Sequence, residues 1–305
     1  MVAVDVMGGD HAPHAVLEGA LAAAQKSIPI KLCGPREFIC QWLDCHNEDW
    51  QNLAITVVDA QEVIAMGDEP VVAVRSKKES SLCKAVALVA DGKSDVVLSA
   101  GSTGALMVAS SLMIGKKEGV QRPAIAGFIA SKKRSHVLIL DLGANTECRP
   151  GHLLQFAHMG VTYVTTTGLH THPTVGLLSN GTEEGKGPQV VKEAYQLLRN
   201  DATLNFMGNV EPYDVFDGKA DIVVCDGFVG NILLKTMEAV SALTQSEKVM
   251  PAQSCASLQQ VKTQGALLLG VKRPVLVCHG NSCASDIESA ITYAWNISCR
   301  NKYNM

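Results

Sequence analysis

The sequence predicts a mostly parallel α/β sandwich, and three observations lead to that class. Short aliphatic runs recur along the chain, and a glycine turn and a helix-forming segment follow most of them. The runs are continuously apolar rather than alternating, which is typical of strands covered by helices on both faces. No proline-rich linker or fixed-period repeat divides the 305 residues. We therefore expect a single domain covering residues 1–305.

The first third of the chain alternates regularly between strand and helix. Apolar runs that predict strands occupy 2–7, 28–34, 53–60 and 95–101, and helices are expected at 14–25, 36–43, 80–92 and 104–115. Pro13 suits the first turn of a helix. The uncharged stretch 96–115 is long enough to span a bilayer. Its early Ser, Gly and Thr residues favour a strand, a tight turn and a helix instead.

The alternation is interrupted in the middle of the chain. The runs 124–130 and 136–145 are consecutive strand candidates, so they predict a β-hairpin. The remaining strands are expected at 174–181, 204–211, 220–228 and 274–280, and helices at 152–164 and 187–198. At "VVCDGFVGN" (223–231) a buried strand is expected to stop at glycine, with a helix starting at "ILLKTMEAV".

Composition and missing motifs exclude several classes of function. The net charge is −4 and no Lys/Arg stripe appears, so no nucleic-acid partner is expected. The sequence has no GxGxxG, GxxxxGK[ST], GxSxG or HExxH motif, so dinucleotide, P-loop, serine-hydrolase and zincin sites lack support. The ten cysteines never form CxxC. We expect them to be reduced thiols in the core of a cytosolic protein, with no metal and no cofactor.

Small polar residues gather at the ends of the predicted strands. The segments that follow the strands read "MGGDHAP", "SAGSTGA", "DLGANTE", "SNGTEEGKG", "CDGFVGN" and "CHGNS". In parallel α/β folds ligands bind beyond the carboxyl ends of the strands. Glycine lets the backbone approach a ligand, and free amides at helix starts favour an anion. The six segments together predict a cleft that handles phosphate.

The same segments resemble one known family, the bacterial acyl-ACP:phosphate acyltransferases (PlsX family). The resemblance rests on "AVDVMGGDHAP", "DEPVVAVRSKKESSL", "SAGSTGALM", "RPAIA", "LDLGANTECRPGHLLQFAHMG", "VGLLSNGTEEGKG", "FMGNVEPYDVFDGKADIVVCDGFVGNILLKTMEA" and "LLLGVKRPVLVCHGNS", which cover most of the chain in the family's order. It implies a three-layer α/β/α sandwich, usually a homodimer, without metal or nucleotide. It also implies that acyl-ACP and inorganic phosphate react to acyl phosphate and holo-ACP for phospholipid synthesis.

The resemblance implies two catalytic residues. The lysine of the family's "EEEKG"-like loop corresponds to Lys186, and the asparagine of its "DGFxGN" loop corresponds to Asn231. Lys186 would neutralise the incoming phosphate, and Asn231 would donate to the thioester carbonyl or align it. The alternative for Lys186 is a solvated lysine at a helix start, and the alternative for Asn231 is a helix cap. Phosphate is already an anionic nucleophile, so the site needs orientation and oxyanion stabilisation rather than a strong base.

Other residues of these segments are candidates for substrate binding, each with a structural alternative such as a turn, a helix cap or a surface position. The candidates are Gly8, Gly9, Asp10, His11, Arg75, Lys77, Ser102, Thr103, Asn145, Asp226, Gly227, Gly230, His279 and Ser282.

Two departures from the family pattern affect these expectations. Asn180 and Thr182 replace an apolar residue and a carboxylate in the lysine loop. The helical segment near 238–264 is shortened and polar, which puts the family's weak peripheral membrane association in doubt. Two alternative functions stay open. One is a non-catalytic acyl-ACP-binding scaffold or regulator, and the other is a short-chain phosphotransacylase that uses acyl-CoA.

Overall fold

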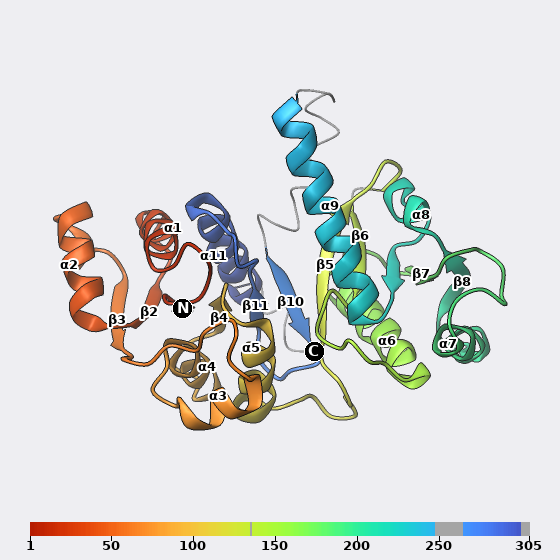
Figure 1. The fold of residues 1–305 in the computed structure, drawn as a ribbon, viewed down its shortest axis with the longest axis horizontal. Coiled ribbons are helices and arrows are strands. Elements are labelled where there is room, and N and C mark those ends of the chain that lie inside the picture. The colour runs from red at the N-terminus through yellow and green to blue at the C-terminus, as the bar shows by residue number, and fades with distance from the viewer. Residues whose placement is uncertain (135, 248–264, 300–305) are drawn as a thin grey trace. The chain divides into compact units, whose positions relative to one another are not determined.

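The computed structural model describes residues 1–134, 136–247 and 265–299 (Figure 1). The chain divides into two compact units. Unit 1 combines Met1–Glu118 with the described part of Lys262–Asn304, and unit 2 is the described part of Gly119–Val261. Each unit is a mostly parallel sheet flanked by helices, which confirms the predicted α/β class. That the whole chain is a single domain stays a prediction.

Unit 1 holds a sheet of strand order β3-β2-β1-β4-β11-β10, in which β10 alone runs antiparallel to its neighbour. Its strands are β1 (Val2–Asp5), β2 (Ile30–Gly34), β3 (Ile55–Asp59), β4 (Val96–Ser99), β10 (Ala266–Leu269) and β11 (Val275–Val277). Its helices are α1 (His14–Gln25), α2 (Arg36–His46), α3 (Pro70–Ser76), α4 (Ser81–Ala90), α5 (Thr103–Ala109) and α11 (Ala284–Cys299), with a 3₁₀ turn η1 (Trp50–Asn52) and a π-helical turn η2 (Ser110–Ile114). Figure 1 draws α1 and α11 on one side of the strands and α3, α4 and α5 on the other.

Unit 2 holds a sheet of order β5-β6-β9-β7-β8, parallel except for the β5–β6 pair. Its strands are β5 (Ala124–Ala130), β6 (His136–Leu140), β7 (Thr174–Leu178), β8 (Asn205–Val210) and β9 (Ile222–Val224). Its helices are α6 (Pro150–Thr166), α7 (Gln189–Asn200), α8 (Pro212–Asp217) and α9 (Gly227–Glu247). The antiparallel β5–β6 pair is the predicted hairpin.

Most predicted elements are confirmed, and the exceptions are short or misplaced. The uncharged stretch 96–115 folds into β4, a turn and α5, as predicted. The strand β10 and the short helices α3 and α8 were not predicted, and α3 and α8 contain too few residues to show a clear helical periodicity. The prediction that a helix starts at residue 232 is wrong, since α9 begins at Gly227. The shortened segment near 238–264 lies largely outside the described residues, because 248–264 are not described.

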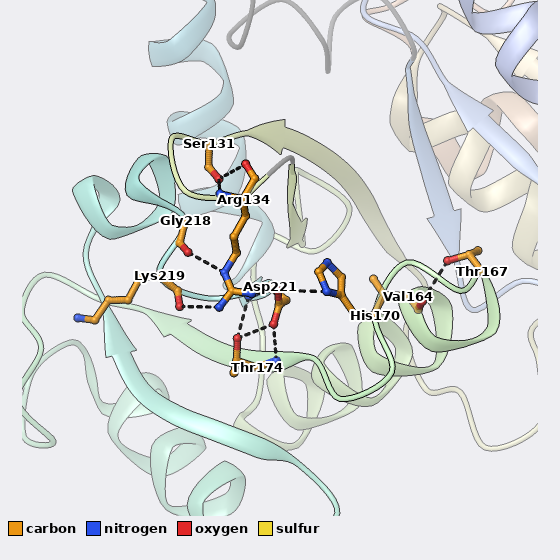
Figure 2. Close-up of polar contacts among 9 residues, drawn as sticks. All are labelled: Ser131, Arg134, Val164, Thr167, His170, Thr174, Gly218, Lys219 and Asp221. Carbon is orange, nitrogen blue, oxygen red and sulfur yellow. Dashed lines mark hydrogen bonds and ion pairs between the residues drawn. The ribbon is translucent and has the colours of Figure 1, made fainter.

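A buried aspartate ties the amino ends of the three central strands of unit 2 together (Figure 2). Asp221, 4% exposed, directly precedes β9 and forms an ion pair with Arg134, which lies in the β5–β6 turn. Its Oδ2 accepts hydrogen bonds from the backbone N–H of Thr174 (2.8 Å) and the hydroxyl of Thr174 (2.7 Å), at the start of β7. Arg134 also donates from Nε to the carbonyl of Gly218 (2.7 Å), and His170 Nδ1 lies 3.4 Å from Asp221 Oδ1. Burial raises the pKa of Asp221, but these donors and cations outweigh it and hold the pKa below its usual range.

Replacing Asp221 by asparagine is expected to lower the free energy of unfolding at pH 7 by about 2–3 kcal/mol. Removing one partner of a fully buried ion pair costs more free energy than this. The cost is smaller here because Arg134, which loses its partner, is partly exposed to solvent. Because the folded-state pKa is depressed, the carboxylate stabilises the protein above its ordinary pKa of 3.8, and the stabilisation is lost as the pH falls further. Urea unfolding from pH 7 to pH 3 should show the difference shrinking below about pH 4. Asp91→Asn, at an exposed ion pair with Lys93, is the control and should cost less than about 0.5 kcal/mol. A difference from wild type that does not change with pH would contradict the electrostatic explanation.

Candidate functional site

The six glycine-containing segments divide evenly between the two units. In unit 1 the segments after β1, β4 and β11 follow three neighbouring parallel strands. In unit 2 the segments after β6, β9 and β7 do the same. Parallel neighbours end at the same edge of a sheet, so each unit gathers three segments at one carboxyl edge. Lys186 and Asn231 both belong to unit 2, where they follow the adjacent strands β7 and β9.

The segment after β6 is organised around a buried carboxylate. Asp141 is fully buried, and its Oδ1 accepts hydrogen bonds from the backbone N–H groups of Gly143 (3.2 Å) and Ala144 (2.9 Å). Its Oδ2 accepts from the backbone N–H of Asn145 (2.7 Å). Burial raises the pKa of Asp141, and the hydrogen bonds oppose that rise. The amides of this segment thus point at Asp141 rather than into solvent.

Asn145 is buried within the same network. Its Nδ2 donates to Asp141 Oδ2 (2.8 Å) and to the carbonyl of Pro123 (2.8 Å). Both amide hydrogens therefore have acceptors inside the protein. That Asn145 donates to phosphate stays a prediction, and such a bond would require one of these two to break.

The start of α9 packs directly on this segment. The N–H of Gly227 donates to the carbonyl of Asn145 (2.7 Å), and a side chain at 227 would lie within 2.7 Å of the Asn145 backbone. A side chain at 230 would overlap the carbonyl oxygen of Asp141. These contacts explain why both positions are glycine: the helix can approach the loop only where no Cβ stands between them.

Asn231 lies in the second turn of α9 and does not cap it. Asp226 immediately precedes the helix, and its Oδ1 accepts the N–H of Val229 (2.9 Å), which is the capping bond. The alternative that Asn231 is a cap is therefore wrong. Asn231 is half-buried, and its side chain lies against Gly143, which has φ +133°: a Cβ built there would be 3.5 Å from Asn231 Cβ and Cγ.

Lys186 lies in the loop between β7 and α7 and is exposed. Its aliphatic stem packs on Gly181, where a Cβ would lie 2.9 Å from Lys186 Cγ. The loop is anchored from β8, since Asn209 Nδ2 donates to the carbonyl of Glu183 (2.8 Å). The stem thus rests on a loop fixed at one side while the ammonium group is open to solvent. Asn180 and Thr182, the departures from the family pattern, are both exposed in the same loop.

The thiol beside this edge is unsuited to nucleophilic attack. Cys225 is buried between β9 and α9, and burial together with the carboxylates of Asp141 and Asp226 raises the pKa of its thiol. The predicted core position also holds for Cys33, Cys83 and Cys278, whereas Cys45, Cys283 and Cys299 are exposed.

In unit 1, glycines of the segments that follow β1, β4 and β11 bring the backbones of these segments close together. A Cβ at Gly8 would lie 2.7 Å from the Gly101 amide nitrogen and 2.5 Å from Asp5 Oδ2. The N–H of Asp10 donates to the carbonyl of Gly280 (2.7 Å). Gly9, the residue before Asp10, adopts φ +120°. The segments after β1, β4 and β11 therefore meet, as the sequence predicts. Asp10 and His11 are exposed at this edge.

The other unit 1 candidates show mainly local contacts. Ser102 is the N-cap of α5, because its Oγ accepts the N–H of Ala105 (3.3 Å), and Thr103 is the first residue of that helix. Ser282 is buried and donates its hydroxyl to the carbonyl of His279 (2.7 Å).

Arg75 and Lys77 lie at the end of α3. Lys77 pairs with Asp68 (2.6 Å) and donates to the carbonyl of Val63 (3.0 Å), while Arg75 is exposed on α3. Substrate binding by any of the unit 1 candidates stays a prediction.

Two buried aspartates at these edges were missed by sequence reasoning. Asp141 directly follows β6, and Asp5, 2% exposed, ends β1 and accepts the hydroxyl of Ser99 (2.6 Å). Burial raises the pKa of Asp5. The only signal available was an acid directly after or at the end of an apolar run, and that pattern is also typical of an exposed turn.

The described residues form neither a membrane-spanning helix nor a cluster of metal ligands. No described helix is both long and apolar enough to cross a bilayer. Nor do the described residues bring three potential His, Cys, Asp or Glu ligands together for a metal ion.

Solved structures share the fold of this chain. A branched-chain phosphotransacylase from Enterococcus faecalis V583 covers 100% of this chain and 99% of its own, with a TM-score of 0.63 and 18% identity. A phosphotransacetylase from Streptococcus pyogenes covers 98% and 94%, with a TM-score of 0.63 and 19% identity. A 4-hydroxythreonine-4-phosphate dehydrogenase from Klebsiella pneumoniae also matches, with a TM-score of 0.57 and 13% identity. At such identities the likeness shows the fold alone, and the dehydrogenase illustrates that one fold hosts different chemistries.

Sequence relatives give a finer assignment. The phosphate acyltransferase of Syntrophomonas wolfei is 41% identical over 308 residues, which is 99% of this chain and 95% of the relative. The phosphate acyltransferase of Bacillus subtilis strain 168 is 39% identical over 320 residues, 98% of this chain and 95% of the relative. A family described as "Fatty acid synthesis protein" matches residues 1–305. The chain therefore belongs to this fatty acid synthesis protein family, together with curated phosphate acyltransferases, and the resemblance seen in its motifs is confirmed.

Proposed function

We propose that this protein is an acyl-ACP:phosphate acyltransferase that forms acyl phosphate and holo-ACP for phospholipid synthesis. Relatives about 41% identical over nearly the whole chain carry the name phosphate acyltransferase. The observation that carries the proposal is the common edge in unit 2. The loop of Lys186 follows β7, and the helix of Asn231 follows the adjacent parallel strand β9. The loop that carries this cation and the helix that carries this amide donor therefore both start at the same carboxyl edge of the sheet.

The reaction needs little from the protein beyond charge and orientation. An oxygen of hydrogen phosphate attacks the thioester carbonyl carbon, forming a C–O bond and a tetrahedral oxyanion. The C–S bond then breaks, and the proton of hydrogen phosphate ends on the departing thiol. Lys186, exposed and on an anchored loop, offsets the charge of the phosphate. Asn231 donates from its amide to the carbonyl oxygen, where negative charge develops.

Direct transfer of the acyl group to phosphate agrees with the protonation state of the nearby Cys225 thiol. A covalent acyl-cysteine intermediate would require a thiolate, and the raised pKa of buried Cys225 keeps that group protonated near neutral pH.

As partners, the protein has a second copy of itself, with which it forms a homodimer, and an acyl carrier protein. It acts in the cytoplasm, with weak peripheral association with the membrane. Support for a self-association surface comes from α9, where Phe228 (58% exposed), Ile232, Val240 and Leu243 (63% exposed) are all exposed apolar side chains. At helical spacing these four positions fall on one face of the helix, which the exposed Lys235 and Thr236 share, and a cluster of exposed apolar side chains is typical of an interface.

The experiment that tests this function compares acyl donors. Purified protein is incubated with inorganic phosphate and either acyl-ACP or the matching acyl-CoA, and acyl phosphate is trapped as its hydroxamate. The proposal predicts phosphate-dependent product with long-chain acyl-ACP and at least about tenfold lower kcat/KM with acyl-CoA. Product from short-chain acyl-CoA alone would instead identify a phosphotransacylase. Binding of acyl-ACP without turnover would identify a scaffold, and either outcome overturns the proposal.

A further inference from the structure

Asp141 is the most heavily hydrogen-bonded carboxylate described in unit 2, and no part of the proposed chemistry uses it directly. Five N–H groups donate to it. They are the backbone N–H of Ile125 (2.9 Å), Gly143 (3.2 Å), Ala144 (2.9 Å) and Asn145 (2.7 Å) and the side-chain Nδ2 of Asn145 (2.8 Å). A buried carboxylate so satisfied is a fixed element around which a loop is built.

The bonds to Asp141 join β5 to the loop 141–145, and α9 packs on that loop. Ile125 belongs to β5, the loop 141–145 follows β6, and the first turn of α9 packs on that loop. The helix touches the loop through the Gly227 N–H on the Asn145 carbonyl and through Gly230 on the Asp141 carbonyl. The third contact is Asn231 itself, whose side chain rests on Gly143.

We propose that Asp141 is the positioning residue for Asn231: its carboxylate holds the loop 141–145 in the shape that fixes the Asn231 side chain for the reaction. The inference rests on the proposed function. Gly143 adopts φ +133° and has no side chain to restrict it, so the backbone there depends on its neighbours for a single conformation. Asp141 supplies that restraint by accepting the N–H of Gly143 and of the two residues after it.

Asp141→Asn tests the inference with almost no change of volume. The new amide retains one oxygen for three of the N–H groups but presents an NH₂ group toward the two donors of Asn145. The loop must shift to separate these donors, and an ångström of displacement at Asn231 is enough to lower the rate about 10²-fold. We expect kcat to fall by about that factor while KM for phosphate, which Lys186 serves, changes less than about threefold.

A double-mutant cycle separates positioning from a general structural role. If Asp141 acts through Asn231, Asp141→Asn costs kcat about 10²-fold in the wild type and less than about threefold in the Asn231→Ala background. Equal losses in both backgrounds would overturn the inference. Should Asp141→Asn fail to fold, Asn145→Ala removes one of the five donors and leaves the carboxylate, and the same cycle applies.

A measurement independent of activity completes the test. Hydrogen exchange of the intact protein should accelerate in peptides covering 141–149 and 225–232 of the Asp141→Asn protein. Asp221→Asn is the matched control, since it alters another buried aspartate at the opposite edge of the same sheet and should leave exchange in those peptides and kcat unchanged. Unchanged exchange in both peptides of Asp141→Asn would overturn the inference, whether or not the protein is active. A wild-type protein that makes no acyl phosphate would overturn the proposed function, and the exchange result would then decide the role of Asp141 in the loop.

Discussion

Replacing Lys186 by alanine is expected to lower kcat/KM for phosphate by about 10³-fold while the protein stays folded. The lysine is the cation proposed to offset the charge of the incoming phosphate, and loss of one such electrostatic contact costs 10²–10³-fold or more in rate. The side chain is exposed and rests on Gly181, so its removal leaves no buried cavity. The free energy of unfolding should change by less than about 0.5 kcal/mol.

The hydroxamate assay at varied phosphate measures this effect directly. Lys192→Ala is the matched control, because Lys192 is also exposed, carries the same charge and lies six residues further along in the first turn of α7. It should retain wild-type kcat/KM within about twofold. Equal activity of the Lys186→Ala and Lys192→Ala proteins would remove Lys186 from the site.

Among the described glycines of unit 2, Gly230 is the one whose replacement by alanine is expected to have the largest effect on stability. The new Cβ would overlap the carbonyl oxygen of Asp141 and lie 3.0 Å from Cys225 Sγ. A backbone carbonyl cannot move aside as a flexible side chain does, so the first turn of α9 must separate from the loop. The free energy of unfolding should fall by at least about 4 kcal/mol, and activity should be lost with it.

Urea unfolding checks this prediction, with Gly151→Ala as the control. Gly151 is the second residue of α6, and a Cβ there meets nothing within 4 Å. Alanine at that position should be neutral or stabilise the protein by up to about 1 kcal/mol, since alanine favours helix over glycine. If both alanine variants unfold at the same urea concentration, the contact between α9 and the loop 141–145 is not tight.

Local patterns predicted the strands and the segments that follow them well. β1, β2 and β4 are mainly aliphatic runs with a glycine at the end of the strand or shortly after it, and these features depend only on near neighbours in sequence. The order of strands in a sheet depends on distant pairings instead. No local pattern indicated that the six segments would divide three and three between two units.

Side-chain contacts in the candidate site also depend on residues that are distant in sequence, so local patterns do not predict them. Asp141 reads in sequence as the polar end of a strand, and only the fold shows that the Ile125 N–H and the Asn145 side chain converge on it. Asp221 forms its ion pair with Arg134, which lies 87 residues away in the sequence. The start of α9 was misplaced because its first turn contains two glycines, which disfavour a helix in isolation. Here close packing on the loop 141–145 outweighs that propensity, and the same packing requires the glycines.

The location of bound phosphate tests the central claim most directly. A crystal structure of the intact protein with inorganic phosphate should show the anion at the carboxyl ends of β6, β9 and β7, in contact with Lys186 Nζ and within reach of Asn231 Nδ2. Phosphate bound only at the unit 1 segments, around Gly8, Gly101 and Gly280, with Lys186 and Asn231 left in solvent, would contradict it.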